Sequence, residues 1–272
     1  MTKIYHAHLW GSREDKYRYL LEHDVTTVEW TELAPASPAY LFIPQNIDCK
    51  AEYETGWKIT EIMPVNSTGV KTHRDHFVFD FDDSALYKRI EEFRNLSISA
   101  KEVSKKYTLS DTRDWKLSER RKSLSANQKW EEHLTKCLYR PFDWRGYYHH
   151  QDVVELPRSE VTRHLFIEEN ISLCTTRQVN GEFKHIFCTK YPVTDCTVSV
   201  ATRERTYLFP LYLYPDSQNN QGSLFVEKSP NLSLYFLSTI REKLGYIPTP
   251  EAIFYYIYAI FHSPTYGSIS KL

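Results

Sequence analysis

Residues 136–164 read KCLYRPFDWRGYYHHQDVVELPRSEVTRH. The stretch mixes four arginines with five large aromatic residues, which are Arg140, Arg145, Arg158 and Arg163, and Tyr139, Phe142, Trp144, Tyr147 and Tyr148. Pro141 and Pro157 fix φ and lack a backbone donor, so we expect the arginines near them on shaped loops. A guanidinium can donate two parallel hydrogen bonds and stack on a ring, which suits recognition of phosphates or base edges. A structural interpretation stays open, in which the aromatic residues form core and the arginines pair with nearby carboxylates: Asp143, Asp152 and Glu155.

Charge is unevenly distributed along the chain. The 272 residues carry a net charge of −1, which argues against a uniformly basic nucleic-acid binder. Residues 101–145 hold 12 Lys and Arg against 7 Asp and Glu, whereas residues 1–100 hold 11 against 16. The basic charge therefore gathers just before and inside the Arg/aromatic stretch, a pattern typical of an electrostatic footprint on nucleic acid. A solvated face without a partner is the alternative.

The composition is that of a globular protein. Hydrophobic residues make up 41% and charged residues 25%, enough apolar side chains for one large domain or two smaller ones. The five cysteines are widely spaced and form no CxxC pair, so we expect reduced core residues of a cytoplasmic protein. The longest apolar run, residues 252–261, is too short to span a bilayer, and we expect no membrane partner.

Local patterns predict both helices and strands. Ser97 or Ser99 is an expected N-cap, and Thr249 is another because Pro250 and an acidic first turn follow it. The Asn-Gly pair at residues 180–181 lies between two apolar runs and predicts a hairpin. Helices are expected over about 13–23, 83–93, 99–107, 118–136, 159–170, 232–244 and 250–262. Strands are expected over about 3–10, 57–63, 76–81, 171–177, 182–189, 198–201 and 206–213.

Two further segments carry polar side chains of chemical interest. The loop Lys71-Thr72-His73-Arg74-Asp75-His76 is basic and bears a hydroxyl group, so it could hold phosphates or orient an acid. The alternative for this loop is a structural turn in which Arg74 pairs with Asp75. His149 and His150 could act as metal ligands, but adjacent residues on a strand point to opposite faces. We therefore expect no metal site.

The sequence contains no recognisable catalytic set. Ser37-Pro38-Ala39-Tyr40 resembles the (Asp/Asn/Ser)-Pro-Pro-aromatic motif with which amino-group methyltransferases grip a flipped base. However, Ala39 stands where the second proline belongs, and no Gly-rich loop for a methyl donor precedes it. P-loop, HExxH and GxSxG motifs are also absent from the sequence. We expect neither catalysis nor a cofactor in this chain.

Six pieces of the sequence together resemble one family. In chain order they are KIYHAHLWGSREDKYRYLL, STGVKTHRDHFVFDF, DTRDWKL, LYRPFDWRGYYHHQDVVELPR, FPLYLY and TPEAIFYYIYAIFHSPTY. They are similar to the C-terminal part of the single-polypeptide Type I (Type ISP) restriction–modification enzymes and of related adenine-specific DNA methyltransferases. In that family a methyltransferase core, which uses S-adenosylmethionine, precedes a target-recognition domain that reads double-stranded DNA.

The resemblance implies an α+β fold of mixed sheets with flanking helices. Residues 1–45 would be the remnant of the end of a methyltransferase domain, and residues 46–272 a DNA target-recognition (specificity) domain truncated at its C-terminus. The chain is thus expected to be a fragment, whose partners would be double-stranded DNA and the methyltransferase, helicase and nuclease domains of a parent enzyme. S-adenosylmethionine is expected only in that parent. The alternative is an interaction module that docks on those domains and touches little DNA.

Twelve residues are the expected DNA contacts. The basic helix would anchor phosphates, and arginines of the Arg/aromatic stretch would read base edges. Arg177 ends a predicted strand beside Gln178 and Asn180, whose side chains can pair with adenine. The full set is Lys71, Thr72, Arg74, Arg120, Arg121, Lys122, Arg140, Arg145, Tyr147, Arg158, Arg177 and Gln178.

Overall fold

A computed structural model describes residues 2–37, 40–44, 54–177, 185–198, 205–215, 228–264 and 266. The chain divides into two compact units, with the division between Gly56 and Trp57. In the first unit, strand β1 (Ile4–His6) pairs antiparallel with β2 (Thr31–Leu33), and helix α1 (Arg13–Glu22) comes between them in the sequence. The Ser12 side chain caps α1, as a helix start requires, yet α1 buries none of its residues. That residues 1–45 end a methyltransferase domain stays a prediction.

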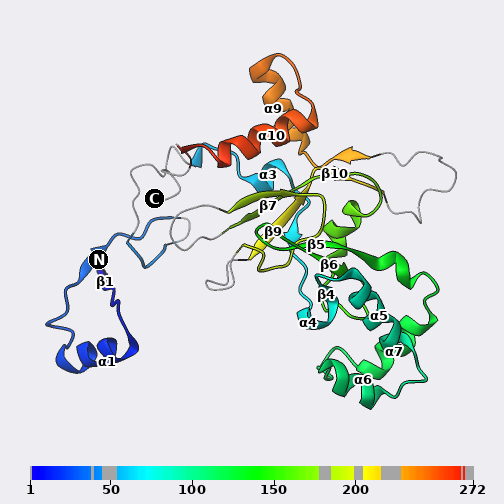
Figure 1. Ribbon diagram of the computed structural model, residues 1–272. Coiled ribbons are helices and arrows are strands. Elements are labelled where there is room, and N and C mark those ends of the chain that lie inside the picture. The colour runs from blue at the N-terminus through cyan, green and yellow to red at the C-terminus, as the bar shows by residue number, and fades with distance from the viewer. Residues whose placement is uncertain are drawn as a thin grey trace. The chain divides into compact units, whose positions relative to one another are not determined.

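One half of the second unit is largely helical and is built on a three-stranded antiparallel sheet (Figure 1). The strand order is β4–β6–β5, with β4 at Phe79–Asp80, β5 at Leu134–Arg140 and β6 at Asp143–Tyr148. The helices are α4 (Asp75–Val78), α5 (Asp83–Arg94), α6 (Ala100–Tyr107) and α7 (Leu117–Ala126), followed by the 3₁₀ helix η1 (Trp130–His133). Two caps explain where α5 and α6 begin: Asp82 accepts from the Ser84 amide, and Ser99 forms a capping box with Glu102.

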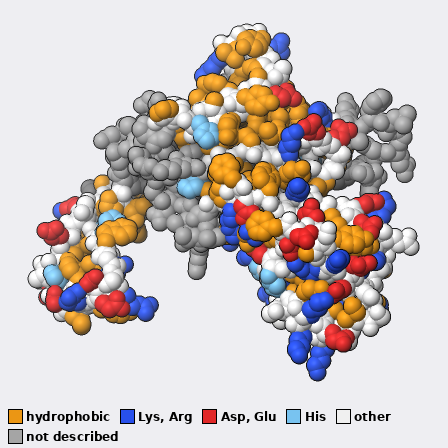
Figure 2. All heavy atoms as spheres, in the orientation of Figure 1, with side chains coloured by type: hydrophobic (Ala, Val, Ile, Leu, Met, Phe, Trp, Pro, Cys, Tyr) orange, Lys and Arg blue, Asp and Glu red, His pale blue; other side chains and the backbone are white. Residues whose placement is uncertain are grey.

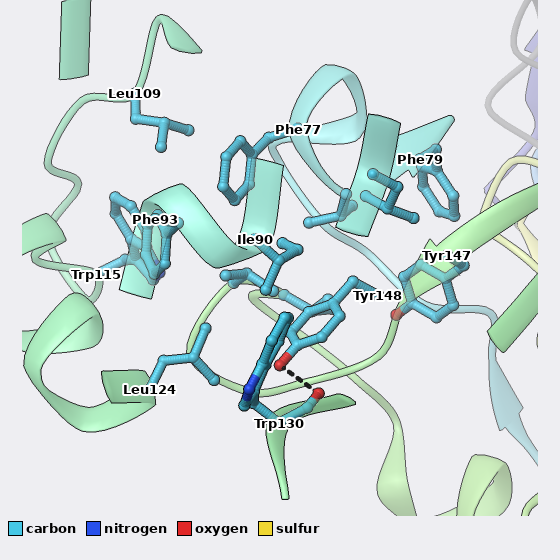
Figure 3. Packing of buried hydrophobic residues seen from close by; sticks show 14 of the residues in the cluster. Phe77, Phe79, Ile90, Phe93, Leu109, Trp115, Leu124, Trp130, Tyr147 and Tyr148 are labelled. Carbon is cyan, nitrogen blue, oxygen red and sulfur yellow. Dashed lines mark hydrogen bonds between the residues drawn. The ribbon is translucent and has the colours of Figure 1, made fainter. Parts of the chain in front are cut away.

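Aromatic side chains fill the core of this half (Figure 3). Phe77 lies 5.2 Å from Phe93, between ring centroids, and Phe93 lies 6.4 Å from Trp115. The buried Tyr148 hydroxyl donates to the main-chain carbonyl of Trp130 at 2.9 Å, which satisfies its polar atom inside the core. This packing fixes the β5–β6 hairpin against α5 and α7.

The other half carries a four-stranded antiparallel sheet of order β3–β9–β7–β8. Its strands are β3 (Ser67–Thr68), β7 (Ser172–Thr176), β8 (Ile186–Thr189) and β9 (Thr206–Pro210). Helices α3 (Ile59–Ile62), α9 (Leu234–Leu244) and α10 (Pro250–Phe261) pack on this sheet around Met63, Phe209 and Phe254. The remaining elements are α8 (Ser159–Thr162), the 3₁₀ helix η2 (Arg163–Leu165) and the small sheet of β10 (Tyr212–Leu213) and β11 (Ser229–Pro230).

Residues 192–197 join the two sheets. The Val70 amide donates to the carbonyl of Val193 at 2.8 Å, and the Leu138 amide donates to that of Pro192 at 2.9 Å. The buried Thr197 hydroxyl donates to the Leu138 carbonyl at 3.0 Å. A Cβ at Gly69 would lie 2.3 Å from the Thr194 carbonyl oxygen, so this joint requires glycine there.

The side chain of Asn231 connects two segments that lie far apart in the sequence. The fully buried side chain donates to the carbonyls of Val65, at 2.7 Å, and Pro210, at 2.9 Å. Its Oδ1 in turn accepts from the Val65 amide at 3.0 Å. Because a buried amide group without partners is costly, these three bonds fix the residue after β11 to the segment before β3 and to the end of β9.

The mixed sheets with flanking helices confirm the expected α+β fold class, and several local predictions hold. The helices capped by Ser99 and Thr249 begin as expected, and β7 pairs with β8, although the 180–181 turn lies outside the described residues. In the described part of the chain, no helix is long and apolar enough to cross a membrane.

Four element predictions are wrong. Residues 59–62 form a single helical turn rather than a strand, because the Glu61 side chain accepts from the Lys58 amide and Met63 is buried after the turn. The segment expected as a strand at 76–81 begins inside α4 and is extended only at β4. The helix expected to reach residue 136 ends at Ala126, since residues 134–140 pair with β6. The helix expected over 159–170 is limited to α8 and η2.

Candidate nucleic-acid interface

The β5–β6 hairpin positions the central residues of the candidate site. Cys137 faces Arg145 across the pair and Leu138 faces Trp144, but the register then shifts so that Arg140 faces Asp143. A bulge of this kind bends the strand and re-aims its side chains. The ring of Tyr139, at the bulge, lies beside both Arg140 and Arg145.

Two guanidinium groups stack on one tyrosine ring. The Cζ atoms of Arg140 and Arg145 lie 4.0 Å and 3.9 Å from the ring centroid of Tyr139. The Tyr139 hydroxyl donates to Oδ2 of Asp75 at 2.9 Å. Burial, and then this bond to a carboxylate, raise the pKa of Tyr139, so the phenol stays neutral. We call Tyr139, Arg140, Arg145, Asp75 and Asp143 the Tyr139 cluster.

The two arginines of the Tyr139 cluster differ in their partners. Arg145 is neutralised: its Nε and Nη2 donate to the two carboxylate oxygens of Asp143 at 3.1 Å and 2.7 Å, which raises the pKa of Arg145. Arg140 donates only to neutral acceptors, the Tyr139 carbonyl at 2.5 Å and Thr194 Oγ1 at 3.1 Å. Among the residues that the structure describes, no carboxylate lies within ion-pair distance of Arg140. Arg140 is therefore a held guanidinium whose charge is available to a ligand.

A cleft of about 470 Å³ opens beside the Tyr139 cluster. Lys71, Arg140 and Arg205 line it with positive charge, and Asp75 and Asp195 contribute negative charge. Neither Lys71 nor Arg205 forms an ion pair within the described ranges. The cleft thus gathers three cations from distant parts of the sequence, a basic arrangement suited to an anionic ligand.

The loop before α4 has a structural role at two of its predicted contacts. Arg74 is buried, its Nη2 donates to Glu155 Oε2 at 2.8 Å, and its Cζ lies 3.8 Å from the Trp115 ring centroid. Burial lowers the pKa of Arg74, and the carboxylate opposes that shift. The buried Thr72 hydroxyl donates to Asp75. The alternative of a structural turn thus describes this loop, but the partner of Arg74 is Glu155 and not Asp75.

The basic helix does not present its three cations on one surface. Arg121 is buried and donates to the carbonyls of Phe93 at 2.7 Å, Asn95 at 2.6 Å and Ile98 at 2.8 Å, and its burial lowers its pKa. Arg120 pairs with the buried Asp152 at 3.4 Å. Lys122 is exposed. Consecutive helical residues point about 100° apart, so three consecutive cations spread over about 200° and cannot all share one face.

The last four predicted contacts are scattered. Tyr147 is fully buried and stacks on Phe79 at 4.8 Å. Arg158 has a φ of 56° at the start of α8, and its buried Nε lacks a hydrogen-bond partner in the described part of the protein. Arg177 is exposed, lies 4.2 Å from the Tyr207 ring centroid and donates to Asn66 Oδ1 at 3.0 Å. Gln178 lies outside the described residues.

Sequence reasoning missed Tyr139, Asp75, Thr194 and Arg205 as parts of the site. Tyr139 lies in the Arg/aromatic stretch, so its place between two arginines was a usable signal. No sequence signal pointed to Arg205, because only the pairing of β9 with β7 and β3 brings this residue to the cleft. Pro38 and Ala39, the centre of the methyltransferase-like motif, lie outside the described residues. Among the described residues, no group of three His, Cys, Asp or Glu side chains could hold a metal ion.

The family of the chain follows from its sequence and fold together. A family model described as the Type ISP C-terminal specificity domain matches residues 61–268. The chain belongs to this family of specificity domains, as the resemblance in its six pieces implied. No curated protein matches the chain.

Solved structures of similar fold include two Type ISP enzymes and the DrdV–DNA complex. One is a nuclease-deletion mutant of the Type ISP restriction–modification enzyme LlaGI, in complex with a DNA substrate mimic. It matches 98% of this chain with a TM-score of 0.65 and 16% sequence identity. The cryo-EM structure of the DrdV–DNA complex matches 94% of this chain with a TM-score of 0.64 and 17% sequence identity. The ATP-dependent Type ISP enzyme LlaBIII, bound to DNA, matches 89% of this chain with a TM-score of 0.59 and 20% sequence identity. The chain spans 21%, 26% and 16% of the length of those chains, respectively. At these identities the likeness shows the fold alone.

Proposed function

We propose that this chain reads a specific sequence in double-stranded DNA, as the specificity part of a Type ISP-like restriction–modification enzyme. Its membership of the specificity-domain family supports this role. The parent enzyme is proposed to carry the adenine-specific methyltransferase, which binds S-adenosylmethionine, and the helicase and nuclease parts. The free, buried Cys137 and Cys174 fit a reducing cytoplasm as the place of action.

The observation that carries the proposal is Arg140. Stacking on Tyr139 and the bond to Thr194 hold its guanidinium plane in place before any ligand arrives. A planar fork held in this way can donate two bonds to O6 and N7 of guanine, the commonest specific contact in the major groove. Lys71 and Arg205 lie along the same cleft and would bind the flanking phosphates.

The roles proposed for the other predicted contact residues follow from whether their side chains are exposed or buried. Lys122 and Arg177 are exposed, so we assign them to phosphate contacts, with the partly exposed Arg120 beside them. Arg145 is held by Asp143 and orients Tyr139 and Arg140. The buried side chains support the fold of the site; they are Thr72, Arg74, Arg121 and Tyr147.

The test compares base reading with phosphate anchoring in the full chain. Duplexes are first selected from a random-sequence library by binding to the wild-type chain. Lys122→Ala should weaken binding to selected and scrambled duplexes alike and reduce the slope of log affinity against log salt by roughly one. Arg140→Ala should instead remove the preference for the selected duplex, by roughly 5- to 150-fold, which corresponds to about 1–3 kcal/mol per bidentate pair.

Lys243→Ala on α9 is the matched control, since it removes one exposed lysine from a helix that packs on the other sheet. If the wild-type chain retains no duplex, or if Arg140→Ala preserves the preference, the proposed reading role is wrong.

A docking function is the second candidate, and α10 favours it. Tyr255, Tyr256 and Ile260 lie on the outer face of the helix and are 60%, 69% and 40% exposed, while Ile253, Phe254 and Ile257 are buried beneath it. Figure 2 shows hydrophobic side chains gathered over α9 and α10. A helix that is apolar on both faces is normally covered on both. This surface would bind another part of the parent enzyme, and a chain that binds that part but no duplex would favour docking alone.

A further inference from the structure

Phe142 has an unusual position at the tip of the β5–β6 hairpin. Arg140 and Asp143 are the last paired residues, so Pro141 and Phe142 form the turn. The Phe142 side chain is 85% exposed and its φ is 62°. Proline at the first turn position and a positive φ at the second match a type II turn, in which glycine or asparagine is usual at the second position.

The conformation and the exposure of Phe142 are therefore both energetically unfavourable. A bulky side chain in the left-handed region is strained, and such strain is concentrated at functional sites. The exposed ring also leaves its apolar surface in water. Within the described part of the chain, the ring has one aromatic neighbour, Phe187, at 5.8 Å and 85°, which is an edge contact. Nothing in the hairpin itself requires phenylalanine here.

The surroundings of the tip indicate what the ring meets. Arg140 begins the turn and carries an available positive charge into the adjoining cleft with Lys71 and Arg205. Trp144, which is 43% exposed, contacts Tyr191 edge-on at 5.6 Å. An apolar tip beside these cations suits a polyanion that also has flat apolar faces. A DNA duplex is such a ligand, because its stacked bases lie between two phosphate backbones.

We propose that Phe142 is a base-stacking residue, which inserts its ring at a base step of the duplex while Arg140 and the cleft cations hold the backbone and base edges. This inference rests on the proposed function and adds a contact to it. Inserted apolar side chains partly unstack a step and bend the duplex, at a cost that the added contacts repay. The turn positions the ring ahead of the strands, where it meets the duplex first.

The experiment uses the full chain and a selected duplex that carries 2-aminopurine at successive positions. Binding of the wild-type chain should change the fluorescence at one step, and Phe142→Trp should preserve that change. Phe142→Ala should abolish it and weaken affinity by roughly 5- to 150-fold, the range that corresponds to about 1–3 kcal/mol per stacked base. The slope of affinity against salt should stay the same, because no phosphate contact is lost.

Controls separate recognition from folding. Phe142→Gly should raise the thermal midpoint of unfolding, since glycine adopts this φ without strain, and should weaken DNA binding as Phe142→Ala does. Tyr246→Ala, at a tyrosine that is 61% exposed after α9, should leave binding and fluorescence unchanged.

Three outcomes overturn the inference. If Phe142→Ala binds and alters the 2-aminopurine signal as the wild-type chain does, Phe142 does not stack, while the proposed function stands. If Phe142→Ala and Phe142→Gly both lower the thermal midpoint, the ring is structural. If the wild-type chain selects no duplex, the proposed function is wrong and this inference with it.

Discussion

At the scale of single residues, burial decides which arginines are available to a ligand. Arg121 and Lys122 are neighbours on α7, yet one donates to three main-chain carbonyls and the other is exposed. Arg74 binds a carboxylate 81 residues away. No local pattern reports such partners, and so the sequence predicted a group of basic residues without separating its structural members from its binding members.

Arg121→Ala should destabilise the protein rather than weaken DNA binding alone. The change leaves the carbonyls of Phe93, Asn95 and Ile98 without their donor in a buried place. We expect a loss of about 3 kcal/mol in the free energy of unfolding, measured by urea denaturation. Lys122→Ala on the next residue should change it by less than about 0.5 kcal/mol. Equal effects of the two substitutions would contradict this account.

His164 should make stability fall in mild acid. Its Nδ1 accepts from the Tyr214 amide at 3.0 Å, and burial, followed by the nearby Arg163, lowers the pKa of His164 to about 4. Below a pH of about 6.5 the unfolded chain takes up a proton that the folded chain refuses until about pH 4. Stability contributed by the neutral ring is therefore present near pH 7 and is lost as the pH falls toward 4, by at most about 3 kcal/mol.

His164→Asn supplies the control for that pH dependence. The asparagine Oδ1 can accept from Tyr214 without titrating in this range. Urea midpoints at pH 7.5 and 5 should differ less in the variant than in the wild-type chain. An unchanged difference would assign the acid sensitivity to other groups, of which His149, whose pKa burial lowers to about 4, is the first candidate.

At the scale of elements, local signals were sufficient for the capped helices and insufficient for short turns. The capping box of Ser99 and Glu102 and the Thr249-Pro250 start are each contained within a few residues, so the sequence predicted both. The single turn of α3 alternates like a strand over too few residues to tell the two apart. The β5–β6 bulge, which forms the Tyr139 cluster, depends on the register of two strands, and no pattern within one strand reports it.

Gly69→Ala should weaken the joint between the two sheets. The added Cβ would lie 2.3 Å from the Thr194 carbonyl oxygen, and a main-chain atom cannot move aside as a flexible side chain can. We expect a loss of about 3 kcal/mol, together with faster hydrogen exchange of the Val70 amide, which bonds to Val193.

Gly245→Ala is the matched control for this joint. Gly245 ends α9 with a φ of 78°, and an added Cβ would have no atom within 4 Å. The cost should be about 1 kcal/mol, from backbone strain alone. If Gly69→Ala costs no more than Gly245→Ala, the close approach at residue 194 is not what holds the sheets together.

At the scale of the whole molecule, the outer face of α10 should make the isolated chain associate with itself. Tyr255, Tyr256 and Ile260 form an exposed apolar stripe, and such surfaces drive association in water. Sedimentation at increasing protein concentration should show dimers or larger species. The double change Tyr256→Ser and Ile260→Lys should restore a monomer without lowering the thermal midpoint. A wild-type chain that stays monomeric at high concentration would contradict this expectation.

The side chain of Asn231 sets the order in which the protein can fold as it is made. Its bonds to Val65 span 166 residues, and β3 pairs with β9 across a similar distance along the chain. Residues 70–154 contain the whole helical core and can pack as soon as they leave the ribosome. Residue 65 must wait until residue 231 has been synthesised, and the strand edge near Leu138 stays open until residues 192–197, to which it bonds, have been made. A pause in synthesis between these points would leave that edge available to chaperones or to a neighbouring nascent chain.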